Sequence, residues 1–313
     1  MKNKNRFAIL KFFDKIRTSV YRRAIYLKFG SGYRHVHAYW PDIKFDFQPD
    51  GSCNVFYKGR KLYTTHSFDD LLNKKYDELT VFGAGPSVNQ MDIAKVSPGT
   101  ALLVNGAMAL ADRLPGGPFM CMALDYAFLW NGKKMIESLP EGTKLLLSDS
   151  FISYTIRKYP GLLDKFELYV THCASQPYMA KEIAAAELPD EYFIKGHNSA
   201  FSLNPQKGLF DGGTILTWAL QMTHYLRAGT TFICGLDLGN FNLPHFYEKK
   251  HDSIKSTGLL RDYEKIENFM RLAAEAFKKD KLKIFNCSPV SKLPYTIFPF
   301  SGHFLKKTAN NTR

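Results

Sequence analysis

Short apolar runs alternate with helix-like segments from residue 77 onward. The runs LTVFGAG, ALLVNGAMAL, FMCMALDYAFLW and TKLLLSD come first along the chain, and TTFICGLDL and LKIFNCS follow later. Between the later runs lie two stretches with helical spacing, GTILTWALQMTHYLRAG and GLLRDYEKIENFMRLAAEAFKKDK. Buried-type strands that alternate with helices are typical of a parallel sheet covered on both faces. The pattern predicts an α/β domain with a Rossmann-like parallel sheet over residues 77–313.

The first 76 residues follow a different pattern. Apolar residues recur at roughly helical intervals through the first thirty positions, whereas residues 42–66 alternate apolar and polar positions and are broken by PDG and KG. This alternation predicts two or three antiparallel strands joined by tight turns. Ser67 precedes FDDLLNKKY and predicts the N-cap of a short helix. We therefore expect a small basic α+β appendage, a helix and a β-hairpin, over residues 1–76.

Charge changes this picture more than composition does. Of the 313 residues, 45% are hydrophobic and 23% charged, which is ordinary for a globular protein, but the formal net charge is +13. Residues 1–30 alone carry nine Lys or Arg and one Asp. An excess of positive charge favours an anionic partner. The basic segment is interpreted either as a helix that lies on an anionic membrane surface or as a helix packed on its own domain.

Several classes of protein are disfavoured by what the sequence lacks. It has no run of 18 apolar residues, and its basic start lacks a clean apolar stretch and a cleavage site, so we expect neither a spanning helix nor a secretory signal. Its five cysteines form no CxxC pattern and are odd in number, which favours a reducing compartment over disulfides or zinc. A nucleic-acid-binding protein driven by charge would show an RNP, helix-turn-helix or zinc signature, and none is present.

Polar residues recur where the predicted strands end. Since ligands of open parallel sheets collect at the carboxyl ends of the strands, these residues are candidates for one shared cleft. The first turn has no GK[ST] and no third glycine of GxGxxG, which disfavours a P-loop or a dinucleotide cofactor and leaves a mononucleotide or nucleotide-sugar. The strand-end candidates are Gly83, Gly85, Pro86, Ser87, Asn105, Asp125, Ser148–Asp149 and Asp237.

Two further segments could carry chemistry. Asp211, Gly212 and Gly213 open a predicted helix, so this helix start could bind an anion, or Asp211 could simply cap the helix. The loop 235–253 holds Asp237, His245, Tyr247, Glu248 and His251. Such a loop could supply a general base and a phenol that stabilises a leaving phosphate, or be an ordinary polar surface loop.

No D-x-D motif occurs in the predicted domain, so a carboxylate-held divalent metal has no obvious ligand pair. A glycosyltransferase built this way would handle its leaving group without a metal. A CMP-sugar fits this expectation, because CMP leaves as a monophosphate with less charge to neutralise. We expect neither a metal nor another cofactor.

Several segments carry a resemblance to a known family, namely FGAGPSV, LVNGAMAL, MALDYAFLW, CGLDL with PHFYEK, and IFNCSPVSKLPYTIFPF. Together they resemble the lipopolysaccharide-core transferases that add a third Kdo residue. The resemblance covers about residues 78–300 and extends, more distantly, to the sialyltransferases of glycosyltransferase family 42. It implies a sheet of the sialyltransferase type and metal-independent, inverting transfer from a CMP-activated 2-keto sugar acid, CMP-Kdo first and CMP-sialic acid as the alternative.

The resemblance also implies roles for individual residues. Gly83, Gly85, Pro86 and Ser87 match the first nucleotide-binding turn, although Ala84 stands where the sialyltransferases have an Asn. The residues Asn105, Asp125, Gly212 and Gly213 correspond to positions that surround the nucleotide, and Asp211, next to them, could meet a ribose. Tyr247 matches a tyrosine that holds the leaving phosphate. The general base is expected at His251 or His245, with Asp237 or Glu248 as alternatives.

The implied acceptor is a lipid-anchored core oligosaccharide, and the implied location is the cytoplasmic face of the inner membrane, with the basic N-terminus against the anionic lipid. A pyrophosphate-transferring nucleotide enzyme with the same GxGPS turn is the alternative from another class, and it would need a metal.

Overall fold

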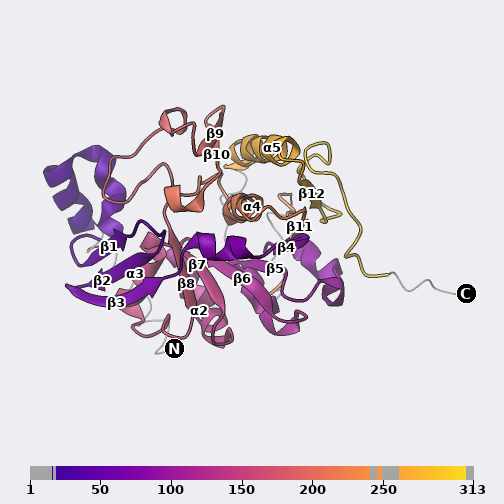
Figure 1. Cartoon of the computed structure of the whole chain (residues 1–313), viewed down its shortest axis with the longest axis horizontal. Helices are drawn as coiled ribbons and strands as arrows, with labels where there is room; N and C mark the ends of the chain where they lie inside the picture. The colour runs from indigo at the N-terminus through magenta and orange to yellow at the C-terminus, as the bar shows by residue number, and fades with distance from the viewer. Residues whose placement is uncertain (1–15, 17–18, 240–244, 249–260, 308–313) are drawn as a thin grey trace, which may run out of the picture.

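The structure is a computed structural model that describes residues 16, 19–239, 245–248 and 261–307. Its centre is a seven-stranded sheet in which every neighbouring pair of strands is parallel (Figure 1). The predicted parallel α/β sheet is thus confirmed. Across the sheet the strands are β12 (Lys283–Asn286), β11 (Thr230–Cys234), β4 (Glu78–Phe82), β5 (Ala101–Val104), β6 (Pro118–Ala123), β7 (Lys144–Ser148) and β8 (Glu167–Thr171).

The strand order contains one reversal of direction. The chain enters the sheet at β4 and adds β5, β6, β7 and β8 one after another on the same side. It then returns and places β11 on the other side of β4, followed by β12 at the edge. In open parallel sheets, ligands bind outside the carboxyl ends of the strands, close to such a reversal. The loops after β4 and β11 therefore meet at the point where the sheet is expected to open toward a ligand.

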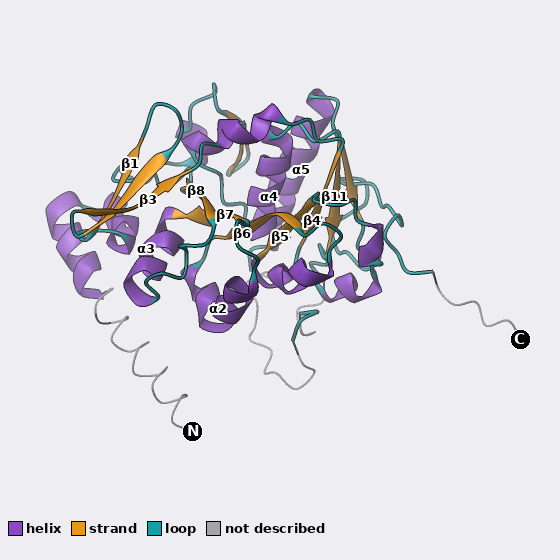
Figure 2. Ribbon diagram, turned by 60° about the horizontal axis from the view of Figure 1, so that its bottom comes forward, coloured by secondary structure: helices purple, strands orange, loops and turns teal. Residues whose placement is uncertain are grey.

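Each strand buries side chains on both faces, which explains why the runs are apolar throughout. Leu102 and Val104 of β5 belong to one core cluster, whereas Leu103 belongs to the cluster on the opposite face. Figure 2 shows the helices that cover the two faces. Helices α4 (Ile215–Tyr225) and α5 (Tyr263–Lys279) cover the first face, and α2 (Leu129–Ser138) and α3 (Asp149–Lys158) cover the second.

Helix α5 shows how the sequence forms these covering helices. Its buried residues Ile266, Phe269, Met270, Ala273 and Phe277 recur at intervals of three and four, so they form one apolar stripe. Lysines fill its last turn, where the partial negative charge of the helix terminus favours cations. Between β8 and α4 the chain adds an antiparallel pair, β9 (Phe193–Gly196) and β10 (Ser199–Ser202), which packs against α5.

The N-terminal appendage contains a helix over residues 19–29, a 3-10 helix η1 (Ser31–Ala38) and an antiparallel sheet. The sheet has three strands, β1 (Ile43–Phe47), β2 (Cys53–Tyr57) and β3 (Arg60–Thr65), where we predicted two or three. Ser67 does cap the following turn, because its side chain accepts the Asp69 N–H. Within the described ranges, no helix has the length and apolar character needed to cross a bilayer.

Several contacts hold the appendage against the rest of the chain, and its buried residues, such as Val36 and Phe45, share a core cluster with Leu103 and Phe151. The His66 N–H donates to the Leu168 carbonyl at the open edge of β8, at 2.8 Å. The guanidinium of Arg157, from α3, donates to the carbonyls of Ala38 and Tyr39 and lies 3.8 Å from an Asp42 oxygen. The end of η1 is thereby held against the carboxyl-end side of the parallel sheet.

Candidate functional site

A cleft of about 480 Å³ lies along the carboxyl ends of β5, β6 and β7. Strand ends form one wall, the start of α4 forms another, and the end of η1 from the appendage closes it. Of the strand-end candidates, Asn105, Asp125, Ser148 and Asp149 line it together with the start of α4, whereas the glycine turn and Asp237 do not. The residues that line it include His35, Tyr39, Asn105, Asp125, Ser148, Asp149, Cys173, Gln176, Asp211, Gly213, Thr214 and Trp218.

Asn105 is one of three residues lining this cleft, with His35 and Trp218, that have a buried polar atom without a partner among the described residues. It follows β5 directly and has a φ of 46°, in the left-handed region that costs energy for a side chain other than glycine. Its Oδ1 is buried and accepts no hydrogen bond from the described residues. A buried acceptor without a partner is costly unless a ligand completes it. Asn105 is therefore positioned to receive an N–H or O–H group from a bound molecule.

Asp149 is the most buried carboxyl group in the cleft. It begins α3 after Ser148, whose hydroxyl accepts the Phe151 N–H as the N-cap. Burial raises the pKa of Asp149 to about 7, and a hydrogen bond from the Ser150 N–H opposes this shift. A carboxyl that titrates near neutral pH within a cleft is typical of functional sites. The sequence identifies Ser148–Asp149 as a strand end, but the burial that sets Asp149 apart depends on the tertiary structure.

Asp125 also lines the cleft, at the end of β6. Its Oδ1 accepts the N–H of Ala127 at 2.8 Å, which caps the short 3-10 turn η6 (Tyr126–Phe128). The carboxyl group is thus held at the edge of the cleft with the adjoining Tyr126 ring.

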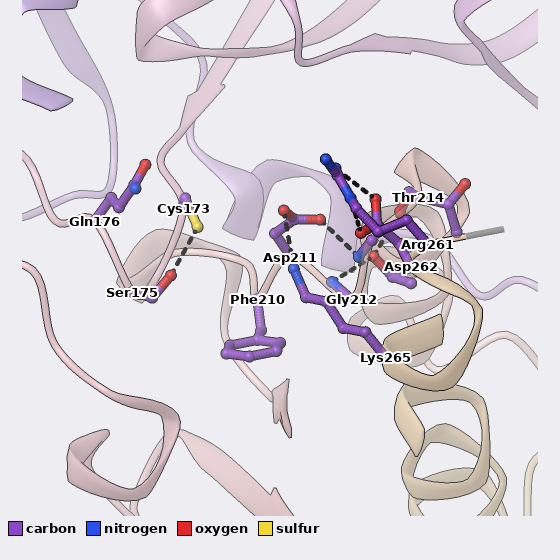
Figure 3. Close-up of polar contacts among 12 residues, drawn as sticks. Cys173, Ser175, Gln176, Phe210, Asp211, Gly212, Thr214, Arg261, Asp262 and Lys265 are labelled. Carbon is purple, nitrogen blue, oxygen red and sulfur yellow. Dashed lines mark hydrogen bonds and ion pairs between the residues drawn. The ribbon is translucent and has the colours of Figure 1, made fainter. Parts of the chain in front are cut away.

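The start of α4 reaches the cleft differently from our expectation (Figure 3). Asp211 is not the N-cap, which is Thr214; its carboxylate instead accepts the Gly213 N–H at 2.8 Å and lies 3.3 Å from Lys265. The Gly212 N–H donates to Thr217 Oγ1. Both glycine N–H groups are therefore occupied within the chain, and the helix start faces the cleft through Gly213, Thr214 and the side chain of Asp211.

These two glycines are required for structural reasons. A Cβ on Gly212 would lie 2.6 Å from the Phe269 ring, so the glycine lets the segment pack against α5. Gly213 has a φ of +97°, which other residues rarely adopt.

The first glycine turn lies beside the cleft and not in its wall. Gly83, Gly85, Pro86 and Ser87 are absent from the cleft lining among the described residues. A Cβ on Gly85 would lie 2.5 Å from the Gly235 carbonyl oxygen, so the turn packs closely on the loop after β11. The glycines therefore allow the loops after β4 and β11 to touch at the reversal of the sheet.

Asp237 links these two loops. Its Oδ1 accepts the hydroxyls of Ser87 and Ser288, and its Oδ2 accepts the Ser87 N–H at 2.9 Å. The carboxylate is 4% exposed and does not line the cleft among the described residues. With its oxygens engaged in this way, Asp237 is placed to position the glycine turn.

Tyr247 lies beside the cleft, over the residue that follows Asn105. A Cβ on Gly106 would lie 2.0 Å from the Tyr247 ring, so the ring packs directly on that glycine. His245 stacks on the same ring, with centroids 5.3 Å apart, and its Nδ1 lies 3.0 Å from Glu248 Oε2. Burial, together with the Glu248 carboxylate, raises the pKa of Tyr247 to about 12, so the phenol remains a hydrogen-bond donor at neutral pH. His251 lies outside the described residues.

Three contributions to the cleft were not identified from the sequence. His35 and Tyr39 come from the appendage, which the sequence presents as a separate unit. Trp218, from α4, is 2% exposed and its indole N–H has no partner among the described residues. Its position within an apolar helix is typical of a core residue, so no local signal distinguishes it.

The described residues bring no three His, Cys, Asp or Glu side chains together as metal ligands, and all five cysteines are free thiols.

No protein-family model matches this chain, and no curated protein matches it. Among the solved structures similar to it is the MAf glycosyltransferase from Magnetospirillum magneticum AMB-1, with a TM-score of 0.43 and 15% identity over 72% of this chain and 33% of that one. This chain thus spans about a third of that protein. Another is the sialyltransferase CstII from Campylobacter jejuni, in complex with the substrate analogue cytidine-5'-monophosphate, with a TM-score of 0.34 and 13% identity over 75% of this chain and 89% of that one. Similarity at this level carries no argument about activity.

Proposed function

We propose that this protein is a metal-independent, inverting glycosyltransferase that uses a CMP-activated 2-keto sugar acid. CMP-Kdo is the primary donor in this proposal, CMP-sialic acid is the alternative, and the acceptor is a lipopolysaccharide or lipooligosaccharide core. The observation that carries the proposal is the cleft at the carboxyl ends of β5–β7, where the buried Oδ1 of Asn105 lacks a partner. An amide oxygen is suited to accept an N–H such as the exocyclic amine of cytosine.

The proposed reaction is a single displacement. The acceptor oxygen attacks the anomeric carbon while the bond from that carbon to the CMP phosphate oxygen breaks, and the acceptor proton passes to a base of the protein. Tyr247 supplies a protonated phenol to the leaving phosphate, which its pKa of about 12 supports. The base is proposed at His251 or His245, with Glu248 next. Asp237 is the least suited of these residues to act as the general base, because its oxygens already accept hydrogen bonds from Ser87 and Ser288.

A peripheral membrane contact belongs to the same proposal. Val20 and Leu27 are 56% and 84% exposed, and their spacing puts them on one side of the helix over residues 19–29. Arg23, which is also exposed, lies beside this stripe, three residues after Val20 and four before Leu27. An apolar stripe beside basic side chains is typical of helices that lie on anionic lipid surfaces.

The donor experiment measures CMP release and product formation with the full chain, excess chelator, and a truncated core oligosaccharide as acceptor. We expect transfer from CMP-Kdo, or from CMP-sialic acid under the alternative, and binding of CMP in calorimetry. Absence of transfer from both donors together with absence of CMP binding would overturn the proposal. Loss of activity on chelation would instead favour the pyrophosphate-transferring alternative, which requires a metal.

The substitution Gly106→Ala tests the position of Tyr247. The new Cβ would overlap the Tyr247 ring at 2.0 Å, so the phenol must move from its place over residue 106. Since one donor to a leaving group is worth roughly 10²–10³ in kcat, we expect a fall in kcat of about 10- to 100-fold for partial displacement. Gly302→Ala is the matched control, because its new Cβ would make only ordinary contacts, the nearest at 3.7 Å. Equal kcat values for the two variants would contradict the role of Tyr247.

A further inference from the structure

A second and larger cleft, of about 1320 Å³, lies between the N-terminal appendage and the domain. The helix over residues 19–29 and η1 form one side, and the region of α2 and α3 forms the other. It is continuous with the first cleft, since the two share the lining residues His35, Ala38, Tyr126, Ser150 and Gln176. A molecule bound in this groove can therefore extend one end into the cleft where we place the donor.

The appendage side of the groove carries unneutralised positive charge. Arg22, Arg23 and Arg34 line it, are exposed, and have no ion pair within the described part of the chain. The acidic side chain in the lining is Glu182, whose Oε1 accepts the amide of Gln176 at 2.9 Å. A guanidinium presents a planar fork of donors that matches the oxygens of a phosphate. Three such groups in one groove favour a ligand with phosphate groups.

The domain side of the groove is aromatic. The rings of Tyr126 and Tyr154 are stacked with centroids 4.6 Å apart and an angle of 17° between their planes. The Trp130 indole N–H donates to the Tyr154 hydroxyl at 3.2 Å, which holds the three side chains together. Flat rings with negative faces attract the weakly positive C–H groups of a sugar ring. This side is suited to a saccharide, whereas the opposite side is suited to its phosphates.

We propose that this groove binds the acceptor, and that the acceptor is a phosphorylated oligosaccharide whose phosphates contact Arg22, Arg23 and Arg34 while a sugar ring packs on Tyr126 and Trp130. The inference rests on the proposed glycosyl transfer and adds the chemistry that selects its acceptor. It also gives the appendage a role in substrate selection, beyond contact with lipid. The apolar stripe with Leu27 borders the groove, so a lipid-anchored acceptor could enter from the membrane side.

The test compares two triple variants of the full chain with equal net charge. R22Q/R23Q/R34Q removes the guanidiniums of the groove, and K278Q/K279Q/K281Q removes three exposed lysines at the end of α5. The probes are a deacylated core oligosaccharide that retains its phosphates and the same material after chemical dephosphorylation. We expect the groove variant to bind the phosphorylated probe about 30-fold more weakly than the wild type, with the lysine variant unchanged. The wild-type protein should bind the dephosphorylated probe more weakly than the phosphorylated one, by a similar factor.

Donor readouts separate this inference from the proposed function. CMP affinity and donor KM should be the same in the wild type and both variants, while acceptor KM rises in the groove variant alone. Binding of the phosphorylated probe that depends on the three arginines, without CMP binding and without transfer from either donor, would support the groove and overturn the reaction. Equal binding by both triple variants would overturn the groove proposal. Equally tight binding of a single-stranded oligonucleotide, at matched phosphate concentration, would also overturn it.

Discussion

Asp237→Ala is expected to destabilise the folded protein by about 3–5 kcal/mol, because it leaves buried donors without a partner. The side chain is 4% exposed, and Ser87 and Ser288, which donate to it, are 1% and 0% exposed. Water cannot replace the lost carboxylate without opening the contact between the loops after β4 and β11. The free energy of unfolding, measured by urea denaturation, checks the expectation.

The control for this prediction is Asp112→Ala, at an exposed position in η5 (Asn105–Arg113). A change of no more than about 0.5 kcal/mol is expected there, as for most surface substitutions. The two variants remove the same carboxylate and add the same Ala, so their difference isolates the buried hydrogen bonds. Similar urea midpoints for both would show that Asp237 does not hold the two loops together.

Asp149→Asn is expected to stabilise the protein at pH 8 by about 2–4 kcal/mol and to have little effect at pH 4. Burial raises the pKa of Asp149 from 3.8 to about 7 in the folded chain. Between these values the folded chain keeps a proton that the unfolded chain releases, so stability falls as pH rises from about 4 to about 7. Each unit of pKa difference corresponds to about 1.4 kcal/mol, and Asn avoids the charged form altogether.

The surroundings of Asp149 explain why its charge is not compensated. The charge of Asp149 raises the pKa of three neighbouring groups, Tyr39, Cys53 and Tyr178, and none of them is a cation that could stabilise the carboxylate. Urea denaturation of both proteins at pH 4 and pH 8 measures the effect, with Asp112→Asn as an exposed control. A difference between Asp149→Asn and the wild type that is the same at both pH values would contradict the raised pKa. A carboxyl that weakens the fold at neutral pH and lines a cleft is typical of a functional site.

Local patterning was a good guide to the central strands and a poor guide to some of their neighbours. Six of the seven parallel strands form at the predicted apolar runs, because a strand buried on both faces needs a continuous apolar segment. Strand β8 (ELYVT) was not among the predicted runs; it lies at the edge of the sheet, where it pairs with β7 on one side and accepts the His66 N–H of the appendage on the other. The β9–β10 pair was also missed, because its four-residue strands are too short for alternation to be distinctive.

The candidate site likewise contains residues that local sequence patterns identified and residues that they did not. The sequence identified Asn105, Asp125 and Asp211, since polar residues after apolar runs are recognisable locally, and all three line one cleft. It also grouped the glycine turn with them, although that turn lies outside the lining among the described residues. Which strand ends share a cleft depends on strand order and on close contacts such as Gly85 against Gly235, and neither is encoded within a single segment.

By itself, then, the sequence determined the α/β class, most of the strands and helices, and the basic character of the N-terminus, because each depends on the spacing of residues within a short segment. Only the tertiary structure decided that Asp237 joins two loops, that Asp149 is buried in the cleft, and that the appendage lies against the carboxyl ends of the strands through Arg157. These features depend on contacts between residues far apart in the chain. The burial and electrostatic environment that give those residues their chemistry arise only when the distant segments pack together.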